Sequence, residues 1–448
     1  MKHFSDARGE ARRIMTQTDL RKRGDRWCLV WDLRGRLRIL CWPASGSGPT
    51  DLAAEIDSQM KQAIGNFWTG ETWFYDAKGS DSDNIVLKQA WNDRAGLALD
   101  SETPEVREIN RRISKGGWFG QPIAPPWPLK DQTVPIISFF SFKGGVGRTT
   151  ALASTAIQLA RAGRRVCVVD LDLEAPGAGV AFPVAGEGPL FGVVDYLIER
   201  PLQARETADL GDYAGVCDSP DIIGTAGAPI TVIPCGRLDD DYLEKLARLD
   251  YEAFLLGQST EEPPLIRLLK EVKSQFKVDY ILLDSRAGLH DIGGLALNGI
   301  AHLDAVFGLD NAQSWAGMSI VISHLGRLRV ERNLPQQNCA FVYAMAPMAT
   351  EEDRPTRVQA FADAAYNLFT GEFYDAEPPE GWPDPIPEDV WPVPASDAQG
   401  EPHFPLVLGF RADIQQSRSL NAIADILTQG DYGDFLTGIL NRIGRTTP

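Results

Sequence analysis

Apolar runs of strand length alternate with helical patterns through the middle of the chain. Strands are expected at 134–140, 165–170, 230–234, 279–284, 304–309 and 339–344, and helices at 151–162, 190–198, 239–256 and 263–276. A sequence in which strands alternate with helices predicts parallel βαβ units, whose ligands bind at the carboxyl ends of the strands. The fold class expected for residues 131–350 is therefore α/β, a mainly parallel sheet flanked by helices.

The pattern before residue 131 predicts a small N-terminal α+β module, residues 1–130. Residues 26–32 and 36–42 read as two strands around a short turn, which is typical of a hairpin. The other expected elements are a helix at 50–64, an extended segment at 66–75, a helix at 104–113 and a Gly- and Pro-rich linker at 116–128. The tryptophans here are expected in the core, and nothing indicates a catalytic site. Partner docking or effector recognition is the default hypothesis for this module.

Residues 351–448 predict a helical C-terminal extension that packs on the preceding domain. Helices are expected at 355–368, 414–427 and 432–443, a short strand at 406–408, and a Pro-rich acidic segment at 372–402. No Lys or Arg occurs between Phe361 and Phe410, so this segment is either a solvated insertion or a docking surface for a basic partner. The last helix has one apolar face and few basic residues, which favours packing over membrane binding.

Composition narrows the class of protein. The chain has 448 residues, 44% of them apolar, which is enough for more than one domain with a buried core. A formal charge of −17 argues against a chain-wide nucleic-acid surface, although a local patch stays open. Six scattered cysteines are typical of reduced core residues in a cytoplasmic protein. We expect neither a signal peptide nor a membrane-spanning segment.

A glycine-rich loop follows the strand that begins at Val134. Its residues are Lys143, Gly144, Gly145, Val146, Gly147, Arg148, Thr149 and Thr150, and a helical pattern begins at Ala151. Glycines let the backbone turn tightly and bring its N–H groups close to an anion, and a helix N-terminus adds further donors. The loop therefore predicts a phosphate site, at which the Thr149 hydroxyl is placed to reach Mg²⁺.

The ordinary P-loop pattern is not met, because Phe142 stands at its first glycine and Arg148 at its lysine. The segment resembles instead the deviant Walker A motif, K-G-G-x-G-K-[ST], of the ParA/MinD-like P-loop ATPases of the SIMIBI class. The resemblance implies that residues 143–150 bind ATP. It also implies that Lys143 is a signature lysine that acts in catalysis by reaching the nucleotide of a partner subunit. An ATP-dependent homodimer is then expected.

Two acidic strand ends fit the same resemblance. Asp170-Leu171-Asp172 is similar to the family's switch I, and Asp284, at the end of an apolar strand, to its Walker B aspartate. The resemblance implies that Thr149, Asp170 and Asp284 support Mg²⁺ and that Asp172 orients the attacking water. Without it, an acidic strand end could simply cap the next turn.

Several neighbouring features leave alternatives open. Arg286 could contact phosphate or pair with an acid, and His290 and His302 are more often packing or surface residues. Residues 345–348 fall where the family holds its base, but they carry no sharp motif. Because the guanine signature [NT]-K-x-D does not occur, ATP is favoured over GTP.

The function expected is an Mg²⁺-dependent, dimerising, slow ATPase switch that regulates or positions a protein partner. The alternative is a nucleotide sensor or scaffold with little hydrolysis, in a bacterial defence or signalling system. Arg148 keeps that alternative open, because guanidinium prefers two-pronged phosphate contacts and differs in shape from the lysine ammonium. A third hypothesis, a bacterial tyrosine kinase, is weak because such kinases carry a tyrosine-rich tail, whereas the residues after Pro402 include only Tyr432.

Overall fold

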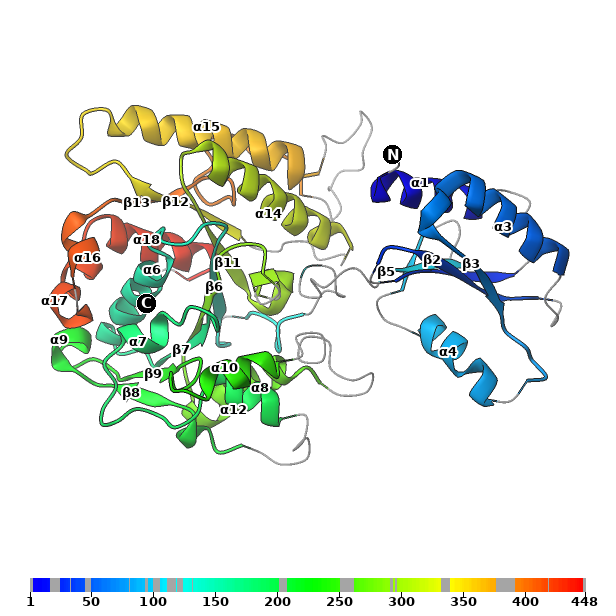
Figure 1. Ribbon diagram of the computed structural model, residues 1–448. Coiled ribbons are helices and arrows are strands. Elements are labelled where there is room, and N and C mark those ends of the chain that lie inside the picture. The colour runs from blue at the N-terminus through cyan, green and yellow to red at the C-terminus, as the bar shows by residue number, and fades with distance from the viewer. Residues whose placement is uncertain are drawn as a thin grey trace. The chain divides into compact units, whose positions relative to one another are not determined.

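The computed structural model describes most of the chain. The described residues are 3–16, 25–32, 34–44, 50–79, 81–92, 96–99, 105–110, 118, 124–130, 132–200, 208–249, 262–290, 293–294, 296–331, 339–375, 391–417 and 419–445. The chain divides into two compact units, which are described separately (Figure 1). The first unit holds Met1–Lys115 and Phe119–Gln121, and the second holds Gly116–Trp118 and Pro122–Pro448.

The first unit is a mixed sheet with helices on both faces. Its elements are α1 (Phe4–Met15), β1 (Arg26–Trp31), β2 (Leu37–Trp42), α3 (Thr50–Ile64), the 3₁₀ turn η1 (Gly65–Phe67), β3 (Trp68–Phe74), α4 (Asp81–Asn92), β4 (Leu97–Ala98) and β5 (Val106–Asn110). Among the described residues the strand order is β3-β2-β1-β5-β4, with β1–β2 and β4–β5 antiparallel and the other pairs parallel. The expected hairpin of β1 and β2 is confirmed.

Side chains that alternate along β1 separate the two cores of this unit. Trp27, Leu29 and Trp31 pack with α1 and α3, whereas Cys28 packs on the other face with Leu87 of α4. The expectation that tryptophans form the core is confirmed for these positions. Because successive side chains of β1 point to opposite faces of the sheet, this strand contributes to the cores under both layers of helices.

The expected helix at 104–113 is wrong where the structure describes it. Residues Val106–Asn110 form β5, which pairs in parallel with β1 in the interior of the sheet. Val106 and Ile109 are buried there, so tertiary packing outweighs the local helical preference. Helices α1 and α4 were not predicted at all.

The second unit is a large sheet covered by helices. In chain order its elements are β6 (Ile136–Ser141), α6 (Arg148–Arg161), β7 (Val166–Leu171), α7 (Ala178–Ala181), α8 (Val193–Glu199), η2 (Leu210–Asp212), β8 (Gly215–Cys217), α9 (Pro220–Ile223), β9 (Ile230–Ile233), α10 (Tyr242–Ala247), α12 (Pro264–Phe276), β10 (Tyr280–Ser285), the π-helical turn η3 (Ala296–Ile300), β11 (Leu303–Gly308), α14 (Ala312–Glu331), β12 (Cys339–Ala346), α15 (Arg354–Glu372), β13 (Leu406–Gly409), α16 (Ala412–Gln416), α17 (Leu420–Ile423), η4 (Ile426–Thr428) and α18 (Asp431–Arg442).

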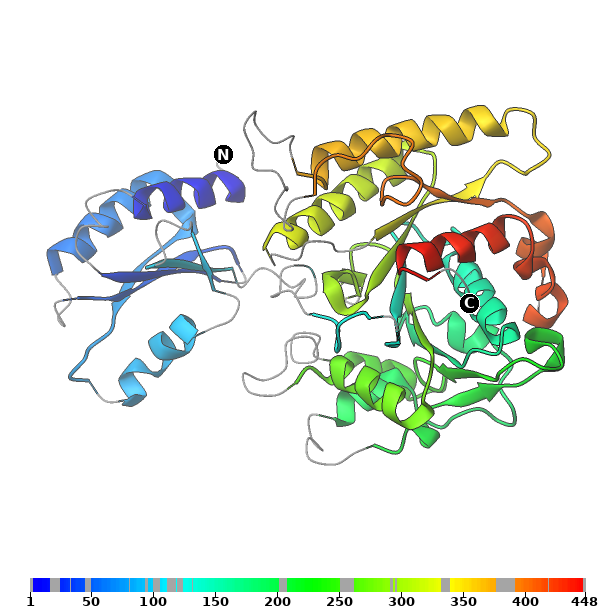
Figure 2. The same cartoon turned by 180° about the vertical axis from the view of Figure 1, so that it is seen from behind.

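This sheet confirms the expected α/β class. Its order over the described residues is β13-β12-β11-β6-β10-β7-β9-β8, and only β8 pairs antiparallel. Helices α6 and α18 pack side by side on one face, as Figure 2 shows from behind. Helices α8 and α12 cover part of the other face, and α14 and α15 cover the rest. The carboxyl ends of β6, β7 and β10 therefore meet at one edge.

The C-terminal residues belong to this same unit. Strand β13 pairs with β12, and the apolar face of α18 is buried, so the expected packing of the last helix is confirmed. The helix expected at 414–427 is broken into α16, α17 and η4. Residues 376–390 of the Pro-rich acidic segment, and residues 250–256 of the helix expected at 239–256, lie outside the described residues. The division at 130 and 350 stays a prediction.

All six cysteines are buried and free of disulfides, as expected. In the described parts of the chain, no helix is long and apolar enough to cross a membrane.

Candidate nucleotide-binding site

The glycine loop connects β6 to α6, which begins at Arg148. Gly145 and Gly147 have φ angles of 73° and 84°, a left-handed conformation that favours glycine. A Cβ added at either position would meet no atom within 4 Å, so the backbone here borders open space. Lys143 is exposed and does not line the adjoining pocket, whereas the segment from Gly145 to Thr150 does.

The predicted metal-site residues come together at the carboxyl edge of the sheet. Asp170 and Asp284 are directly opposite each other on the paired strands β7 and β10. The Thr149 hydroxyl donates to Asp284 Oδ2 at 2.8 Å. Asp170 accepts the backbone N–H groups of Gly177 and Gly179 and thus also caps the following turn. Parallel strand ends explain why residues so distant in sequence converge.

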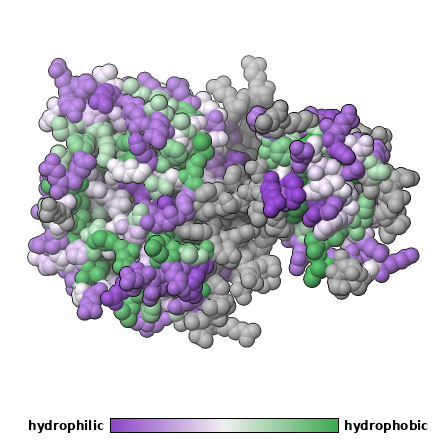
Figure 3. Space-filling view, viewed as in Figure 1, coloured by the Kyte–Doolittle hydropathy of each residue, from purple (hydrophilic) through white to green (hydrophobic). Residues whose placement is uncertain are grey.

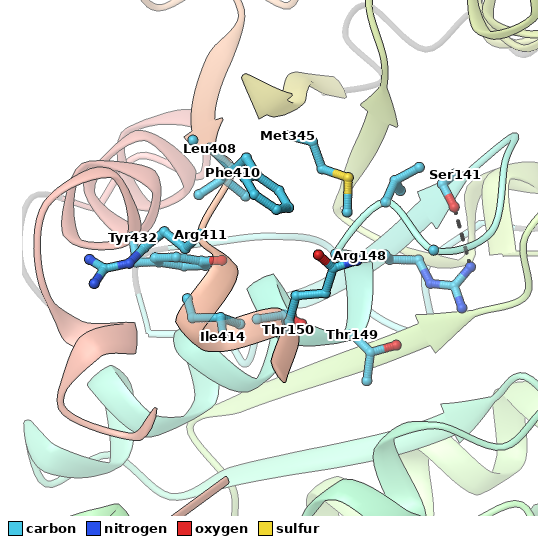
Figure 4. Close-up of a pocket in the computed structure, with 15 residues that line it drawn as sticks. Ser141, Arg148, Thr149, Thr150, Met345, Leu408, Phe410, Arg411, Ile414 and Tyr432 are labelled. Atoms are coloured by element: carbon cyan, nitrogen blue, oxygen red, sulfur yellow. Dashed lines mark hydrogen bonds between the residues drawn. The ribbon is translucent and has the colours of Figure 1, made fainter. Parts of the chain in front are cut away.

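Arg148 forms hydrogen bonds to two carboxylates, those of Asp172 and Asp284. Its Nη2 donates to Asp172 Oδ2 at 2.8 Å and its Nε to Asp284 Oδ1 at 3.0 Å, and all three residues are buried. Figure 4 shows its side chain directed toward Ser141 and away from Phe410 and Tyr432. Arg148, which stands where the motif has its second lysine, is therefore hydrogen-bonded to protein carboxylates in this structure.

This carboxylate cluster is electrostatically strained. Burial, and then the negative charge of Asp284, raise the pKa of Asp170 to about 7. Burial also raises the pKa of Asp284, despite the opposing effect of Arg148 and Thr149. In addition, the buried Asp172 Oδ1 has no hydrogen-bond partner within the described residues. Buried acids under mutual repulsion are common at functional sites.

The donor set suits Mg²⁺ in its chemistry. Hydroxyl and carboxylate oxygens are the ligands that Mg²⁺ takes from proteins, usually one or two of them together with phosphate and water. Across the described residues, no group of three or more His, Cys, Asp or Glu side chains is arranged to hold a metal by itself. Thr149, Asp170 and Asp284 thus fit a shared metal–phosphate site better than an all-protein cage.

The pocket extends from the loop to the C-terminal residues. It has a volume of about 430 Å³ and runs from Gly145–Thr150 to Met345, Phe410, Arg411, Ile414 and Tyr432 (Figure 4). Sequence reasoning pointed to residues 345–348 but missed those after 408. A non-glycine residue with positive φ marks this end: Met345, with a φ of 50°, lies where the pairing of β12 and β13 shifts register. No local sequence signal identifies the remaining contributors, because they come from separate elements.

The loops after β7 and β10 contact each other. Glu174 pairs with Arg286 at 2.6 Å and with His290 at 2.7 Å. Arg286 therefore pairs with an acid in this structure. His302 lies elsewhere, bonded to the Ile136 N–H and the Trp127 carbonyl in a structural role. Trp118 also reaches the second loop, where its Nε1 donates to the His290 carbonyl at 2.7 Å.

Phe142, which replaces the first glycine of the ordinary P-loop, lies against α14. A Cβ added at Gly317 would lie 2.1 Å from the Phe142 ring, so only glycine leaves space for it. The two departures from the ordinary pattern are thus compensated by the surrounding structure: Phe142 by Gly317 and Arg148 by its carboxylates.

Comparison with known proteins gives a family match within the second unit. The profile of the CobQ/CobB/MinD/ParA nucleotide binding domain matches residues 137–186, which span β6, the glycine loop, α6, β7 and α7. The second unit is ParA/MinD-like. Its matched residues include the loop and both acids of the Asp170–Asp172 pair, but not Asp284 or the pocket residues from Met345 onward.

Two characterised proteins are similar in sequence to parts of this chain. An iron-sulfur cluster carrier protein of Pseudomonas fragi is 46% identical over 70 residues, 16% of this chain and 24% of that protein. The arsenical pump-driving ATPase of Escherichia coli is 30% identical over 172 residues, 38% of this chain and 26% of that protein. The chain thus aligns with about a quarter of the length of each relative.

Solved structures of the same group are more distant. A ParA family ATPase from Chlorobium tepidum TLS covers 68% of this chain and 97% of its own, with 14% identity and a TM-score of 0.42. The cell division ATPase MinD of Pyrococcus furiosus covers 50% of this chain and 75% of its own, with 22% identity and a TM-score of 0.34.

Proposed function

We propose that this protein is an Mg²⁺-dependent ATPase switch that dimerises with ATP bound and controls a protein partner in the cytoplasm. The observation that carries the proposal is the pocket that joins Gly145–Thr150 to Met345, Phe410 and Tyr432 beside the Arg148 carboxylate cluster. A site with phosphate donors at one end and apolar and aromatic side chains at the other suits a nucleoside triphosphate.

The glycine loop and the acidic strand ends have distinct roles in this proposal. The N–H groups of the loop and of the first turn of α6 bind the phosphates, for which the helix N-terminus is electrostatically favourable. Thr149 and Asp284 hold Mg²⁺, and Asp170 supports them; the metal supplies compensation of phosphate charge. Asp172 orients the water that attacks the γ-phosphate.

Arg148 would have to exchange partners during the cycle. Its guanidinium is bonded to Asp172 and Asp284, so phosphate oxygens compete with these carboxylates for the same donors. A bidentate arginine binds phosphate well, but it stabilises the charge of phosphoryl transfer only when placed accurately. We therefore expect tight binding with slow turnover.

The proposed dimer places the exposed Lys143 against the nucleotide of the second copy. Apolar side chains are also exposed near the loop after β7: Val180 of α7 is 67% exposed and Leu243 of α10 is 76% exposed. Figure 3 shows hydrophobic residues at the surface of the second unit, among hydrophilic ones. Exposed apolar residues beside a loop that responds to the bound nucleotide suit a protein contact that forms in only one nucleotide state. The relationship to the arsenical pump-driving ATPase supports hydrolysis as the activity.

The test has two parts. Calorimetry measures the binding of ATP and GTP to the protein in Mg²⁺ or in EDTA, and a phosphate-release assay then measures ATP turnover. We expect Mg²⁺-dependent ATP binding, weaker GTP binding and slow phosphate release. Light scattering should show an ATP-dependent dimer that Lys143→Ala abolishes while ATP still binds. Equal ATP affinity with Mg²⁺ and EDTA would contradict the metal assignment.

A second function, a nucleotide sensor with little hydrolysis, is favoured by one observation. The side chain proposed to orient water, Asp172, is held by Arg148 at 2.8 Å. If that ion pair persists with ATP bound, binding changes conformation without turnover. Single-turnover measurements separate the two functions, because a sensor would hold unhydrolysed ATP for the lifetime of the complex.

A further inference from the structure

The base end of the pocket is built from three chain segments that are far apart in sequence. The first segment contributes Met345, at the register shift of β12; the second contributes Gly409–Arg411, at the end of β13; and the third contributes Tyr432, at the start of α18. A second pocket of about 480 Å³ adjoins the first and shares Gly409–Arg411 and Tyr432 with it. The shape of this end depends on how the three segments are held together.

One ion pair connects all three segments. Arg354, the first residue of α15, donates from Nη1 to the Pro347 carbonyl and from Nη2 to Asp431 Oδ1, both at 2.8 Å. The other oxygen of Asp431 accepts the Gly409 N–H at 2.7 Å. Charge-assisted hydrogen bonds of this kind fix geometry more tightly than neutral ones.

The ion pair lies close against the backbone of Gly409. A Cβ added at Gly409 would lie 2.5 Å from Asp431 Oδ2 and 2.8 Å from Arg354 Nη1. The next residue, Phe410, donates its N–H to the Ala346 carbonyl at 2.7 Å. The backbone of β13 is therefore fixed on one side by the ion pair and on the other by β12, and Phe410 and Arg411 follow directly.

The ion pair is not needed to hold α18 on the sheet. That helix buries Phe435, Leu436, Ile439 and Leu440, which keep it in place by apolar packing. The side chains of Arg354 and Asp431 are 16% and 25% exposed, at the rim of this core. Their loss should loosen the pocket locally and leave the fold intact.

We propose that Arg354 and Asp431 are positioning residues for the nucleoside end of the site. They act through Pro347, Gly409 and the neighbouring Tyr432, and they set the affinity for the base and ribose but not for the phosphates. The inference rests on the proposed nucleotide binding and deepens it. It predicts that a change at the base end alters the affinity for the nucleoside without altering the affinity of the glycine loop for phosphates.

The test compares ATP with inorganic tripolyphosphate, which lacks the nucleoside. Calorimetry with Mg²⁺ on the full chain gives both dissociation constants for wild type, Arg354→Gln, Asp431→Asn and the double variant. We expect each single variant to weaken ATP binding about 10-fold and tripolyphosphate binding less than about 2-fold. The double variant should lose no more than either single one, because both remove the same interaction.

Arg357→Gln is the matched control. It removes a positive charge three residues further along α15, where Arg357 forms an exposed ion pair with Asp353 at 3.9 Å and contacts Tyr343, neither of which lines the pocket. ATP affinity should not change in this variant. Equal losses for ATP and tripolyphosphate, additive losses in the double variant, or no loss at all would overturn the positioning role. A wild type that binds no ATP would overturn the proposed function, and the inference with it.

Discussion

Two clusters in which arginines contact a buried carboxylate, one in each unit, differ in how completely the carboxylate oxygens are hydrogen-bonded. In the first unit Glu108 accepts hydrogen bonds from Arg8, Arg12 and Trp31, so both of its oxygens are satisfied. In the second unit one arginine serves two carboxylates, and a buried oxygen of Asp172 has no partner within the described residues.

The pKa shifts of the two clusters have opposite signs. Burial would raise the pKa of Glu108, but hydrogen bonds and positive charge from Arg8 and Arg12 lower it below its usual value. The pKa values of Asp170 and Asp284 are raised, because burial and repulsion exceed the available compensation. A satisfied cluster stabilises a fold, whereas an under-compensated one is suited to bind a cation or a charged ligand.

The sharpest test of this contrast is Asp284→Asn, with the largest expected effect. The amide keeps one oxygen to accept from Arg148, and its NH₂ can donate to the Thr149 hydroxyl, but one negative charge is lost. We expect Mg²⁺-dependent ATP affinity to fall on the order of 100-fold, as for loss of a metal-supporting carboxylate. The free energy of unfolding without nucleotide should change little or increase, since repulsion with Asp170 is relieved. Strong destabilisation in urea would instead place this cluster with the structural one.

The matching substitution in the first unit is Glu108→Gln. It removes the negative charge that two arginines share and leaves one acceptor oxygen where Arg8, Arg12 and Trp31 had two, so the unit should lose about 2 kcal/mol in urea unfolding. ATP affinity should be unchanged. Glu71→Gln is the control, because Glu71 pairs with Arg38 where the two side chains are 49% and 37% exposed. That exposed pair should contribute less than about 1 kcal/mol. An equal loss of unfolding free energy in Glu71→Gln and Glu108→Gln would contradict the structural role assigned to the Glu108 cluster.

The two clusters also differed in how well the sequence predicted them. Asp170, Asp172 and Asp284 are at the ends of apolar strands, and strand ends of a parallel sheet must meet, so their convergence could be expected. Glu108 was placed in a helix and α1 was not predicted, because pairing with β1 decides the conformation of Val106–Asn110. Local propensity contains no information about such long-range pairing.

The base end of the pocket was largely unpredictable for a related reason. Phe410, Arg411 and Tyr432 come from different elements and reach the site only through β13 and α18. Likewise, the contacts of Arg148 with Asp172 and Asp284 depend on side-chain directions that spacing does not specify. A contiguous motif can be recognised from one sequence, whereas a surface assembled from remote segments cannot.

Arg148→Lys tests whether its carboxylate contacts limit turnover. A lysine offers a compact charge in place of the two-pronged guanidinium, so Asp172 and Asp284 are no longer bridged in the same way. We expect phosphate release to rise about 10-fold, the scale of a better placed catalytic group, with ATP affinity within about 3-fold.

Arg165→Lys serves as control, since Arg165 forms an exposed pair with Asp279 away from the site; its turnover should equal that of wild type. A fast wild type that Arg148→Lys slows would mean that the loop operates with arginine, and the sensor function would lose its support.

The smallest expected effect is the acid response of the first unit. Because the folded pKa of Glu108 is depressed, its stabilising contribution is complete above the ordinary value of 4.5 and is lost as pH falls through the lower folded value. Urea midpoints of the wild type should therefore decline below about pH 4.5 more steeply than those of Glu108→Gln, which has no such proton to bind. The two profiles should be parallel above pH 6. A variant that declines as steeply as wild type would show that other carboxyl groups dominate acid unfolding, and the lowered pKa of Glu108 would not distinguish the clusters.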